Sequence, residues 1–80
     1  MELKQLISKR TYQLLKERKW TQYKLAQRSA LPLSTLYHVL SHKGKSVTME
    51  TLLNICRGFD ISLAEFFGDK SFDLENIADD

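Results

Sequence analysis

The spacing of the apolar residues constrains the fold of this chain more than any other feature. Leu3, Leu6 and Ile7 begin a series of apolar positions that lie three and four residues apart, which is the period of one face of an α-helix. No stretch sustains the alternation of apolar and polar residues that a half-buried strand requires. Glycine and proline, which interrupt helices, number only 3 and 1 among the 80 residues. The sequence therefore predicts an all-α fold in one small domain.

Capping residues and breaks in the apolar series divide the chain into five expected helices. The first spans about residues 2–18, and Thr21 is placed to cap the second. The third is expected near residues 32–41, because Pro32 is tolerated in the first turn of a helix. The core side chains expected from the second, third and fourth helices are Leu25, Ala26, Thr35, Leu36, Val39, Leu40, Leu52, Leu53, Ile55, Cys56 and Phe59.

The last two expected helices begin at polar caps. Thr48 is placed to cap the fourth, and Ser62 and Glu65 form a capping box for the fifth. Gly68 is expected to end the fifth helix by taking the left-handed conformation. Residues 63–67 hold more apolar surface than so small a body is expected to bury, so part of this helix is a candidate dimer surface.

Charge is distributed unevenly along the chain. The net charge of +2 combines residues 1–68, with 11 Lys and Arg against 5 Asp and Glu, and residues 69–80, with one Lys against five acidic residues. The two segments therefore carry +6 and −4, which predicts a basic domain over 1–68 and an acidic C-terminal tail over 69–80. A basic body suits a polyanionic partner. The tail is expected to fray, or to dock on the body or on a partner through Phe72, Leu74 and Ile77.

Cysteine and histidine usage disfavours a disulfide and a metal site. Cys56 is the only cysteine, and its place among apolar positions of the fourth helix favours an inert core residue over a redox sensor. His38 and His42 lie one helical turn apart, but no third ligand is near in sequence. We expect no metal and no cofactor.

The sequence also disfavours membrane insertion and catalysis. No segment approaches the roughly 18 apolar residues of a membrane span, and MELKQLISKR does not resemble a signal peptide, so we expect a cytoplasmic protein. No nucleophile, base and orienting group occur together, and no Gly-rich phosphate loop is present. We therefore expect no enzymatic activity.

The third expected helix has an apolar side and an exposed side. At roughly 100° per residue, its core positions fall on one side and Leu33 lies at the edge of the other. A short helix that follows a tight turn in a basic body can enter the major groove of DNA. The residues expected to face the bases are Leu33, Ser34, Tyr37 and His38. The residues expected to contact phosphates are Thr21, Gln22, Ser41, Lys43 and Lys45.

The chain resembles the lambda-repressor-like, Cro-type (XRE) helix-turn-helix family over about residues 7–67. The residues that carry the resemblance are Thr21-Gln22, Leu25-Ala26, Ser34-Thr35-Leu36, Val39, a Gly/Lys loop, Thr51-Leu52-Leu53 and Ile61-Ser62-Leu63-Ala64-Glu65-Phe66-Phe67. The resemblance implies a compact five-helix DNA-binding domain, with the helix-turn-helix at the second and third helices, that acts as a dimeric transcriptional regulator. It also implies that Gln22 clamps the DNA backbone and that Leu33, Ser34 and His38 occupy base-reading positions.

Three departures from the family pattern carry physical consequences. Ala30 stands where the family usually has the glycine of the turn, which costs on the order of 1 kcal/mol in a left-handed conformation and predicts a slightly rearranged turn. Pro32 replaces a capping Ser or Thr. Leu15 and Leu40 stand where some members place a buried Arg and Glu, and replacing both charges by apolar residues is often neutral or stabilising.

Two functions follow from the sequence. The first is a sequence-specific DNA-binding regulator, a repressor that inserts the third helix into the major groove as a dimer. Because the base-facing set has no Arg, Asn or Gln, we expect moderate specificity, with thymine-methyl contact and DNA shape weighing more than bidentate guanine contacts. The alternative is a protein-binding module such as an antitoxin or anti-repressor, which the uncharged helix face and the acidic tail favour. The tail could also compete with DNA for the basic surface.

Overall fold

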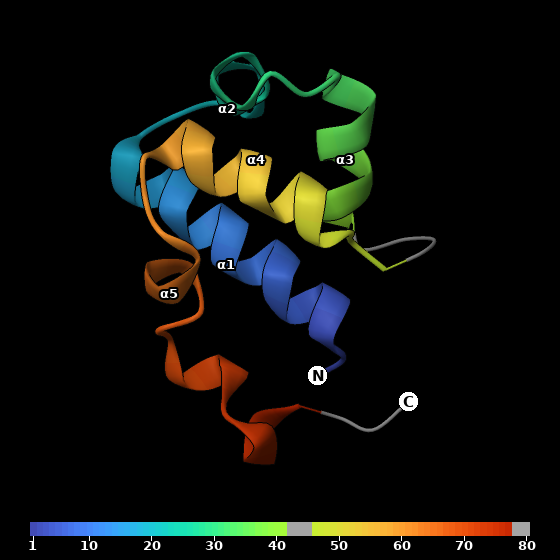
Figure 1. Cartoon of the computed structure of the whole chain (residues 1–80), viewed down its shortest axis with the longest axis vertical. Coiled ribbons are helices and arrows are strands. Elements are labelled where there is room, and N and C mark those ends of the chain that lie inside the picture. Colours follow the sequence, from blue (N-terminus) through green and yellow to red (C-terminus); the bar gives the residue numbers. More distant parts are fainter. Residues whose placement is uncertain (42–45, 78–80) are drawn as a thin grey trace.

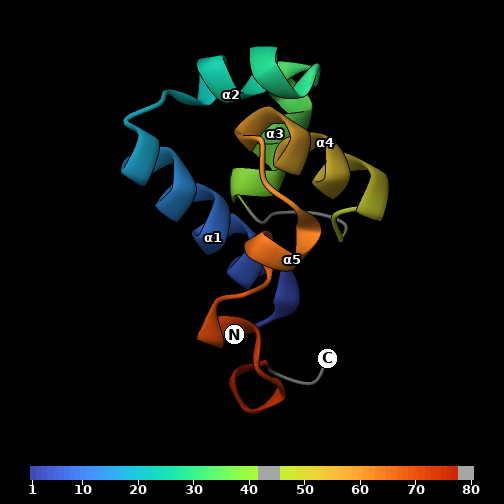
Figure 2. The ribbon, with the colours of Figure 1, turned by 60° about the vertical axis from the view of Figure 1, so that its left-hand side comes forward.

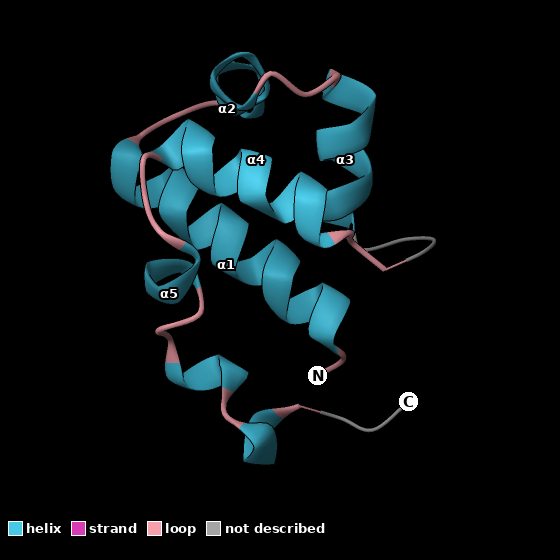
Figure 3. Cartoon of the chain, viewed as in Figure 1, coloured by secondary structure: helices cyan, strands magenta, loops and turns pink. Residues whose placement is uncertain are grey.

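The protein is built from helices. The computed structural model describes residues 1–41 and 46–77, and within these ranges it contains five α-helices, two 3₁₀-helices and no strand (Figure 3). The α-helices are α1 (Leu3–Arg18), α2 (Gln22–Ser29), α3 (Leu33–Ser41), α4 (Met49–Phe59) and α5 (Leu63–Phe66), and the 3₁₀-helices are η1 (Lys70–Phe72) and η2 (Leu74–Asn76). The all-α prediction is confirmed, and the five expected helices begin and end close to the predicted residues.

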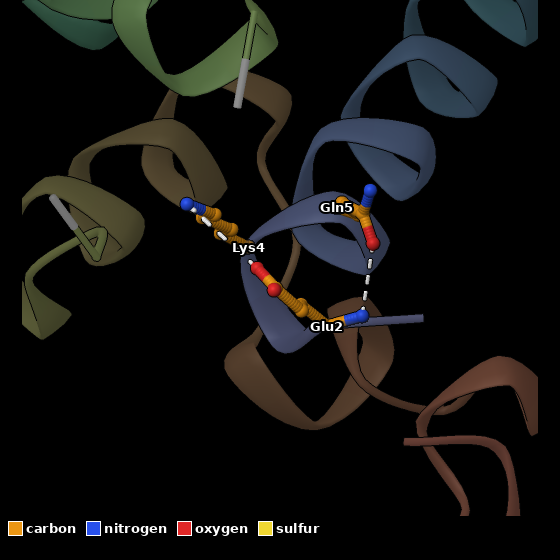
Figure 4. A network of polar contacts seen from close by, with 3 residues as sticks. All are labelled: Glu2, Lys4 and Gln5. Atoms are coloured by element: carbon orange, nitrogen blue, oxygen red, sulfur yellow. Dashed lines mark hydrogen bonds and ion pairs between the residues drawn. The ribbon is translucent and has the colours of Figure 1, made fainter. Parts of the chain in front are cut away.

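Each α-helix that has a polar cap begins where the sequence places that cap. The Thr21 hydroxyl accepts a hydrogen bond from the Lys24 N–H at 3.1 Å, and Thr48 does the same for the Thr51 N–H. Ser62 caps α5 in the same manner. At α1, Gln5 Oε1 accepts the Glu2 N–H at 2.9 Å, and Lys4 lies 3.7 Å from the Glu2 carboxylate (Figure 4). These bonds satisfy backbone donors that a helix leaves without partners.

Three α-helices end in a left-handed residue that is not glycine. Lys19, Ala30 and Asp60 have φ values of 57°, 54° and 59° and follow α1, α2 and α4. The prediction for Gly68 is wrong: α5 ends at Phe66, the next residue has φ −88° and ψ 4°, and Gly68 is not left-handed. Arg10 takes over the role of the cap, because its guanidinium donates to the carbonyls of residues 65 and 66 at 2.9 and 2.8 Å.

The helices pack so that α2 and α3 share one end of the molecule. α2 packs on α4 and α3, α3 packs on α1, and α5 packs on α4. Figures 1 and 2 show α2 and α3 at one end of the long axis and the 3₁₀-helices at the other. The molecule measures 34 × 25 × 20 Å, so both helices of the expected DNA-reading unit are held on one small core.

The core contains the side chains that the apolar spacing selects. The buried cluster consists of Ile7, Leu14, Leu15, Leu25, Ala26, Leu36, Val39, Leu40, Leu52, Ile55, Cys56, Phe59 and Phe66. Leu15 and Leu40 both lie in it, as expected for an apolar replacement of an ion pair. Two predictions are only partly right, because Leu53 and Thr35 are half-buried. Leu53 lies about 100° from Leu52 around α4, at the edge of its buried face.

The C-terminal tail docks on the body through one aromatic residue. Phe72 lies with its ring centre 4.8 Å from that of Phe67 and 6.0 Å from that of Phe66. The Met1 amino group donates to the Asn76 carbonyl at 3.4 Å. Leu74, which was also a candidate for docking, is 89% exposed. Part of the apolar surface expected for a dimer is therefore covered by the tail of the same chain.

Within residues 1–41 and 46–77, no helix combines the length and the apolar character that crossing a lipid bilayer requires.

Candidate nucleic-acid interface

The exposed side of α3 carries the residues that the sequence predicts. Leu33 and Tyr37 are 46% and 63% exposed, and Ser34 and His38 are exposed as well. Leu36 and Val39 are buried on the opposite side. The helix therefore presents uncharged donors, acceptors and apolar atoms to solvent, and neither an acidic nor an amide side chain.

The N-terminus of α2 lies next to this helix. Thr21 is exposed and its hydroxyl accepts the Lys24 N–H, while the other N–H groups of the first turn have no partner within the helix and can bind an anion. Gln22 is half-buried, and its amide donates to the Tyr12 hydroxyl at 3.3 Å. The first turns of α2 and α3 contain no acidic residue. The helix N-terminus and the basic body thus favour the same partner, a phosphate.

Tyr12, from α1, belongs to this surface and was missed by the sequence analysis. A cavity of about 100 Å³ lies between α1, α2 and α3 and is lined by Tyr12, Gln22, Tyr37, Leu40 and Ser41. The cavity brings Tyr12 together with Gln22 and Ser41, which are predicted to contact phosphates, and with Tyr37, which is predicted to face the bases. A signal was present in the sequence, because Tyr12 falls outside the apolar series of α1, and it is 46% exposed, as the other two tyrosines of the chain also are exposed.

The Ser41 hydroxyl is engaged by its own helix. It donates to the His38 carbonyl at 3.2 Å, and Ser41 is half-buried. The hydroxyl oxygen can still accept a hydrogen bond, but a phosphate oxygen needs a donor. Ser41 reaches a phosphate as a donor only if this bond is given up.

His38 lines a second cavity at the N-terminus of α4. The cavity measures about 180 Å³ and is lined by Thr35, His38, Val39, Ser46, Val47, Thr48 and Thr51. Thr48 accepts the Thr51 N–H and donates to the Thr51 hydroxyl, so the wall opposite His38 is formed by the capped N-terminus of α4. His38 thus lies between the exposed face of α3 and a second helix N-terminus.

Lys43, Lys45 and His42 lie outside the described residues. The predicted phosphate contacts of the two lysines and the pairing of His38 with His42 therefore stay predictions. Elsewhere in the described ranges, no group of three His, Cys, Asp or Glu side chains is arranged to hold a metal ion. Cys56 is 1% exposed, and burial raises the pKa of its thiol.

The connection between α2 and α3 keeps its tight geometry without a glycine. Ala30 has φ 54° and ψ 35°, and the N–H groups of Ala30 and Leu31 bond back to the carbonyls of Gln27 and Ala26. Ala30 itself thus takes the left-handed conformation, and the difference expected from the turn of other family members stays a prediction. Pro32 directly precedes α3, where its carbonyl accepts the Thr35 N–H at 3.0 Å, so it occupies the cap position rather than the first turn.

These features define the class of protein. Two helices joined by a tight turn, with the second exposed along one side and the N-terminus of the first beside it, form a helix-turn-helix of the kind that binds DNA. The family model of the Cro/C1-type HTH DNA-binding domain matches residues 12–71, three quarters of the chain. The protein belongs to this family, and the resemblance found in the sequence is confirmed. No curated protein and no solved structure matches the chain.

Proposed function

We propose that the protein is a sequence-specific DNA-binding repressor that inserts α3 into the major groove. The family is one of DNA-binding domains, and the observation that carries the proposal is the joining of Gln22 and the exposed face of α3 at one cavity. A phosphate bound at the N-terminus of α2 would set the register in which Leu33 and Ser34 meet base edges. Bound at a promoter, the protein would occlude transcription.

The proposed complex is a dimer on two half-sites. Each copy places one α3 in the major groove, with half-sites roughly 34 Å apart on one face of the duplex. Phosphate contacts come from Thr21 and Gln22, from the predicted loop lysines Lys43 and Lys45, and from Ser41 once its hydroxyl is released. This arrangement requires no membrane and no cofactor, and we expect it in the cytoplasm.

Base contact is proposed for four residues of different chemistry. Leu33 packs on a thymine methyl, Ser34 and Tyr37 exchange hydrogen bonds with base edges or phosphates, and His38 donates to guanine N7 or a phosphate. Since none of these is a bidentate Arg or Asn contact, we propose that DNA shape contributes a large share of specificity.

A gel-shift titration at several salt concentrations tests the proposal. The DNA includes a selected binding site and a scrambled duplex. Gln22→Ala should weaken binding to both, because a phosphate contact is lost, whereas Leu33→Ala should weaken binding to the selected site alone. Gln27→Ala, an exposed glutamine of the same helix that does not line the cavity, is the matched control. Equal affinity of the wild-type protein for all duplexes at every salt concentration would show that specific recognition is wrong.

A protein-binding module, such as an antitoxin or anti-repressor, is the second candidate. It is favoured by the exposure of Leu33, Tyr37 and the tail residue Leu74, which give uncharged apolar surface that a protein can cover. Co-purification with a small partner that protects Leu33 or Leu74 from solvent, together with no retention on DNA, would favour this function over the first. The two functions can coexist in one protein.

A further inference from the structure

Three cations surround the only tryptophan of the chain. The charged groups of Arg18, Lys24 and Arg28 lie 5.3, 5.2 and 5.1 Å from the centre of the Trp20 ring. We call these four residues the Trp20 cluster. The indole holds the cations by cation–π attraction, and two of them are also held by α4, because Arg18 donates to the Phe59 carbonyl and Arg28 to the Gly58 carbonyl.

No carboxylate among the described residues forms an ion pair with these three cations. Within residues 1–41 and 46–77 the only ion pair joins Lys4 and Glu2. Lys24 and Arg28 are exposed, and Arg18 and Trp20 are half-buried. Like charges collected on one ring repel each other, so the free energy of this surface falls when an anionic group binds there.

The Trp20 cluster lies away from the face proposed to bind DNA. Lys24 is about 200° from Gln22 around α2, and Arg28 follows Lys24 one turn later. The cluster joins the end of α1, α2 and the end of α4, whereas the cavity at the DNA-facing surface joins the other side of α2 to α3. A straight DNA duplex docked on α3 would therefore leave the cluster exposed.

The chain carries a segment of the matching chemistry. The tail has a net charge of −4, and Asp73, Leu74 and Glu75 are all exposed. No carboxylate of the described part of the tail forms an ion pair with a described residue. An exposed leucine between two carboxylates can lie against an indole while the carboxylates approach the cations beside it.

The tail cannot reach the Trp20 cluster of its own chain. The Met1 amino group contacts Asn76 where α1 begins, and Arg18 is at the other end of this helix of 16 residues, roughly 24 Å away. Figure 1 shows the end of α1 that leads into α2 well above the 3₁₀-helices, which lie at the bottom of the view. We infer that the Trp20 cluster binds the acidic segment 73–76 of a second copy of this chain.

This contact joins two different surfaces, one on each copy. With one contact per pair of copies the interaction is heterologous and builds rings or chains, whereas two reciprocal contacts close a two-fold dimer. Exposed ion pairs are weak and screened by salt, so the association depends on concentration and on ionic strength. On DNA it would link proteins bound at neighbouring sites and leave the face of α3 free.

Charge reversal with complementation tests the inference on the full chain. One variant carries Lys24→Glu and Arg28→Glu, and the other carries Asp73→Lys and Glu75→Lys. Sedimentation velocity at about 50 mM salt should show self-association of the wild-type protein, which is lost at about 0.5 M salt. Each variant alone should associate roughly 2- to 30-fold more weakly, and an equal mixture of the two should regain association, because each supplies the surface that the other has lost. Circular dichroism establishes that both variants are folded.

Fluorescence gives a local measurement, because Trp20 is the only tryptophan. A synthetic peptide of residues 69–80 should change the emission in a saturable manner, and the same peptide with Asp73→Lys and Glu75→Lys should not. The matched control is Lys16→Glu with Arg57→Glu, which reverses two exposed cations that do not contact Trp20 and should preserve binding of the peptide.

Three results would overturn the inference. The first is a monomeric wild-type protein at low salt and high concentration. The second is a mixture of variants that associates no better than each variant alone. The third is a loss of DNA affinity in the Lys24/Arg28 variant that exceeds the loss in the control, since the cluster would then belong to the DNA interface. DNA binding measured below the concentration of self-association tests the proposed repressor separately.

Discussion

Ala30 adopts a backbone conformation that glycine would adopt at lower cost. Its φ of 54° is left-handed, and an L-residue pays roughly 1–2 kcal/mol there. The Ala30 side chain is exposed, and the backbone hydrogen bonds of the turn depend on the φ and ψ of this residue and not on its side chain. The conformation is enforced by the packing of α2 and α3 on either side of the turn.

Ala30→Gly should therefore stabilise the protein. We expect a gain on the order of 0.5–1 kcal/mol in the free energy of unfolding, which is the relief at φ 54° less the greater freedom of glycine in the unfolded chain. Urea denaturation followed by circular dichroism measures it. Gln27→Gly, in the interior of α2, is the control and should destabilise by about 1 kcal/mol. A loss of stability in Ala30→Gly would show that the turn does not have this conformation.

Gly58 and Ser29 form a close approach between α4 and α2. A Cβ atom on Gly58 would lie 2.2 Å from Ser29 Oγ and 3.1 Å from the Ser29 backbone nitrogen. Ser29 is 3% exposed, and its hydroxyl has no hydrogen-bond partner among the described residues. Glycine is thus needed at position 58 because this buried contact leaves no room for a side chain. It is not needed for a left-handed φ.

Substitutions at this contact should be coupled. We expect Gly58→Ala to cost about 1–3 kcal/mol of stability by overpacking, and Ser29→Ala to gain up to about 1 kcal/mol by removing an unsatisfied hydroxyl. The double variant should recover part of the cost, since the closest clash is with the hydroxyl. Thermal denaturation of the wild-type protein, the two single variants and the double variant measures this coupling. Strict additivity would show that the two side chains do not meet.

At the scale of the elements, α5 and the tail are the parts that sequence patterns predict least well. Apolar spacing and capping residues were sufficient to predict α1 to α4, because each of those features involves residues that are close together in the sequence. The end of α5 depends on Arg10, which lies 55 and 56 residues from the carbonyls that it binds. Tyr12 was missed at the candidate site for the same reason, since its bond to Gln22 joins two helices.

Asp69 lies between α5 and η1, and its carboxylate caps η1. The Ser71 N–H donates to its carboxylate at 2.9 Å, and this bond, with smaller contributions from Arg10 and Lys9, lowers the pKa of Asp69. A carboxyl group with a lowered pKa in the folded state stabilises that state above its unfolded pKa, about 3.9, and the contribution is lost as the pH falls through the folded value.

The docked tail should therefore loosen below about pH 3.9, and Asp69→Asn should remove that step. NMR signals of Phe72, followed from pH 6 to pH 2, report the contact with Phe66 and Phe67. Asn retains the capping oxygen and does not titrate, so the variant isolates Asp69 from the other carboxylates. Identical pH profiles for both proteins would contradict this role of Asp69.

At the scale of the whole molecule, the tail opposes the charge of the body. Residues 1–68 carry +6 and residues 69–80 carry −4, and the described part of the tail lies at the end of the molecule opposite α2 and α3 (Figure 2). Leu3, where α1 begins beside the bond between Met1 and Asn76, lies nine residues along the helix from Tyr12 of the DNA-facing surface. This separation of roughly 14 Å exceeds the roughly 8 Å screening length at physiological salt. The tail should thus affect DNA binding only when salt is low.

Asp73→Asn combined with Glu75→Gln should raise DNA affinity in that range. The change makes the net charge more positive by two, so at about 20 mM salt we expect a gain of roughly 2- to 10-fold, equal for specific and scrambled duplexes because it acts through the field of the whole protein. At about 0.3 M salt the gain should vanish, since screening then extends over only a few ångströms. Fluorescence anisotropy with labelled duplexes, at protein concentrations too low for self-association, measures both affinities. Lys70→Gln is the control and should change affinity in the opposite direction. A gain that persists at high salt would place the tail in direct contact with the DNA-facing surface, where it would act as a competitor instead of a distant charge.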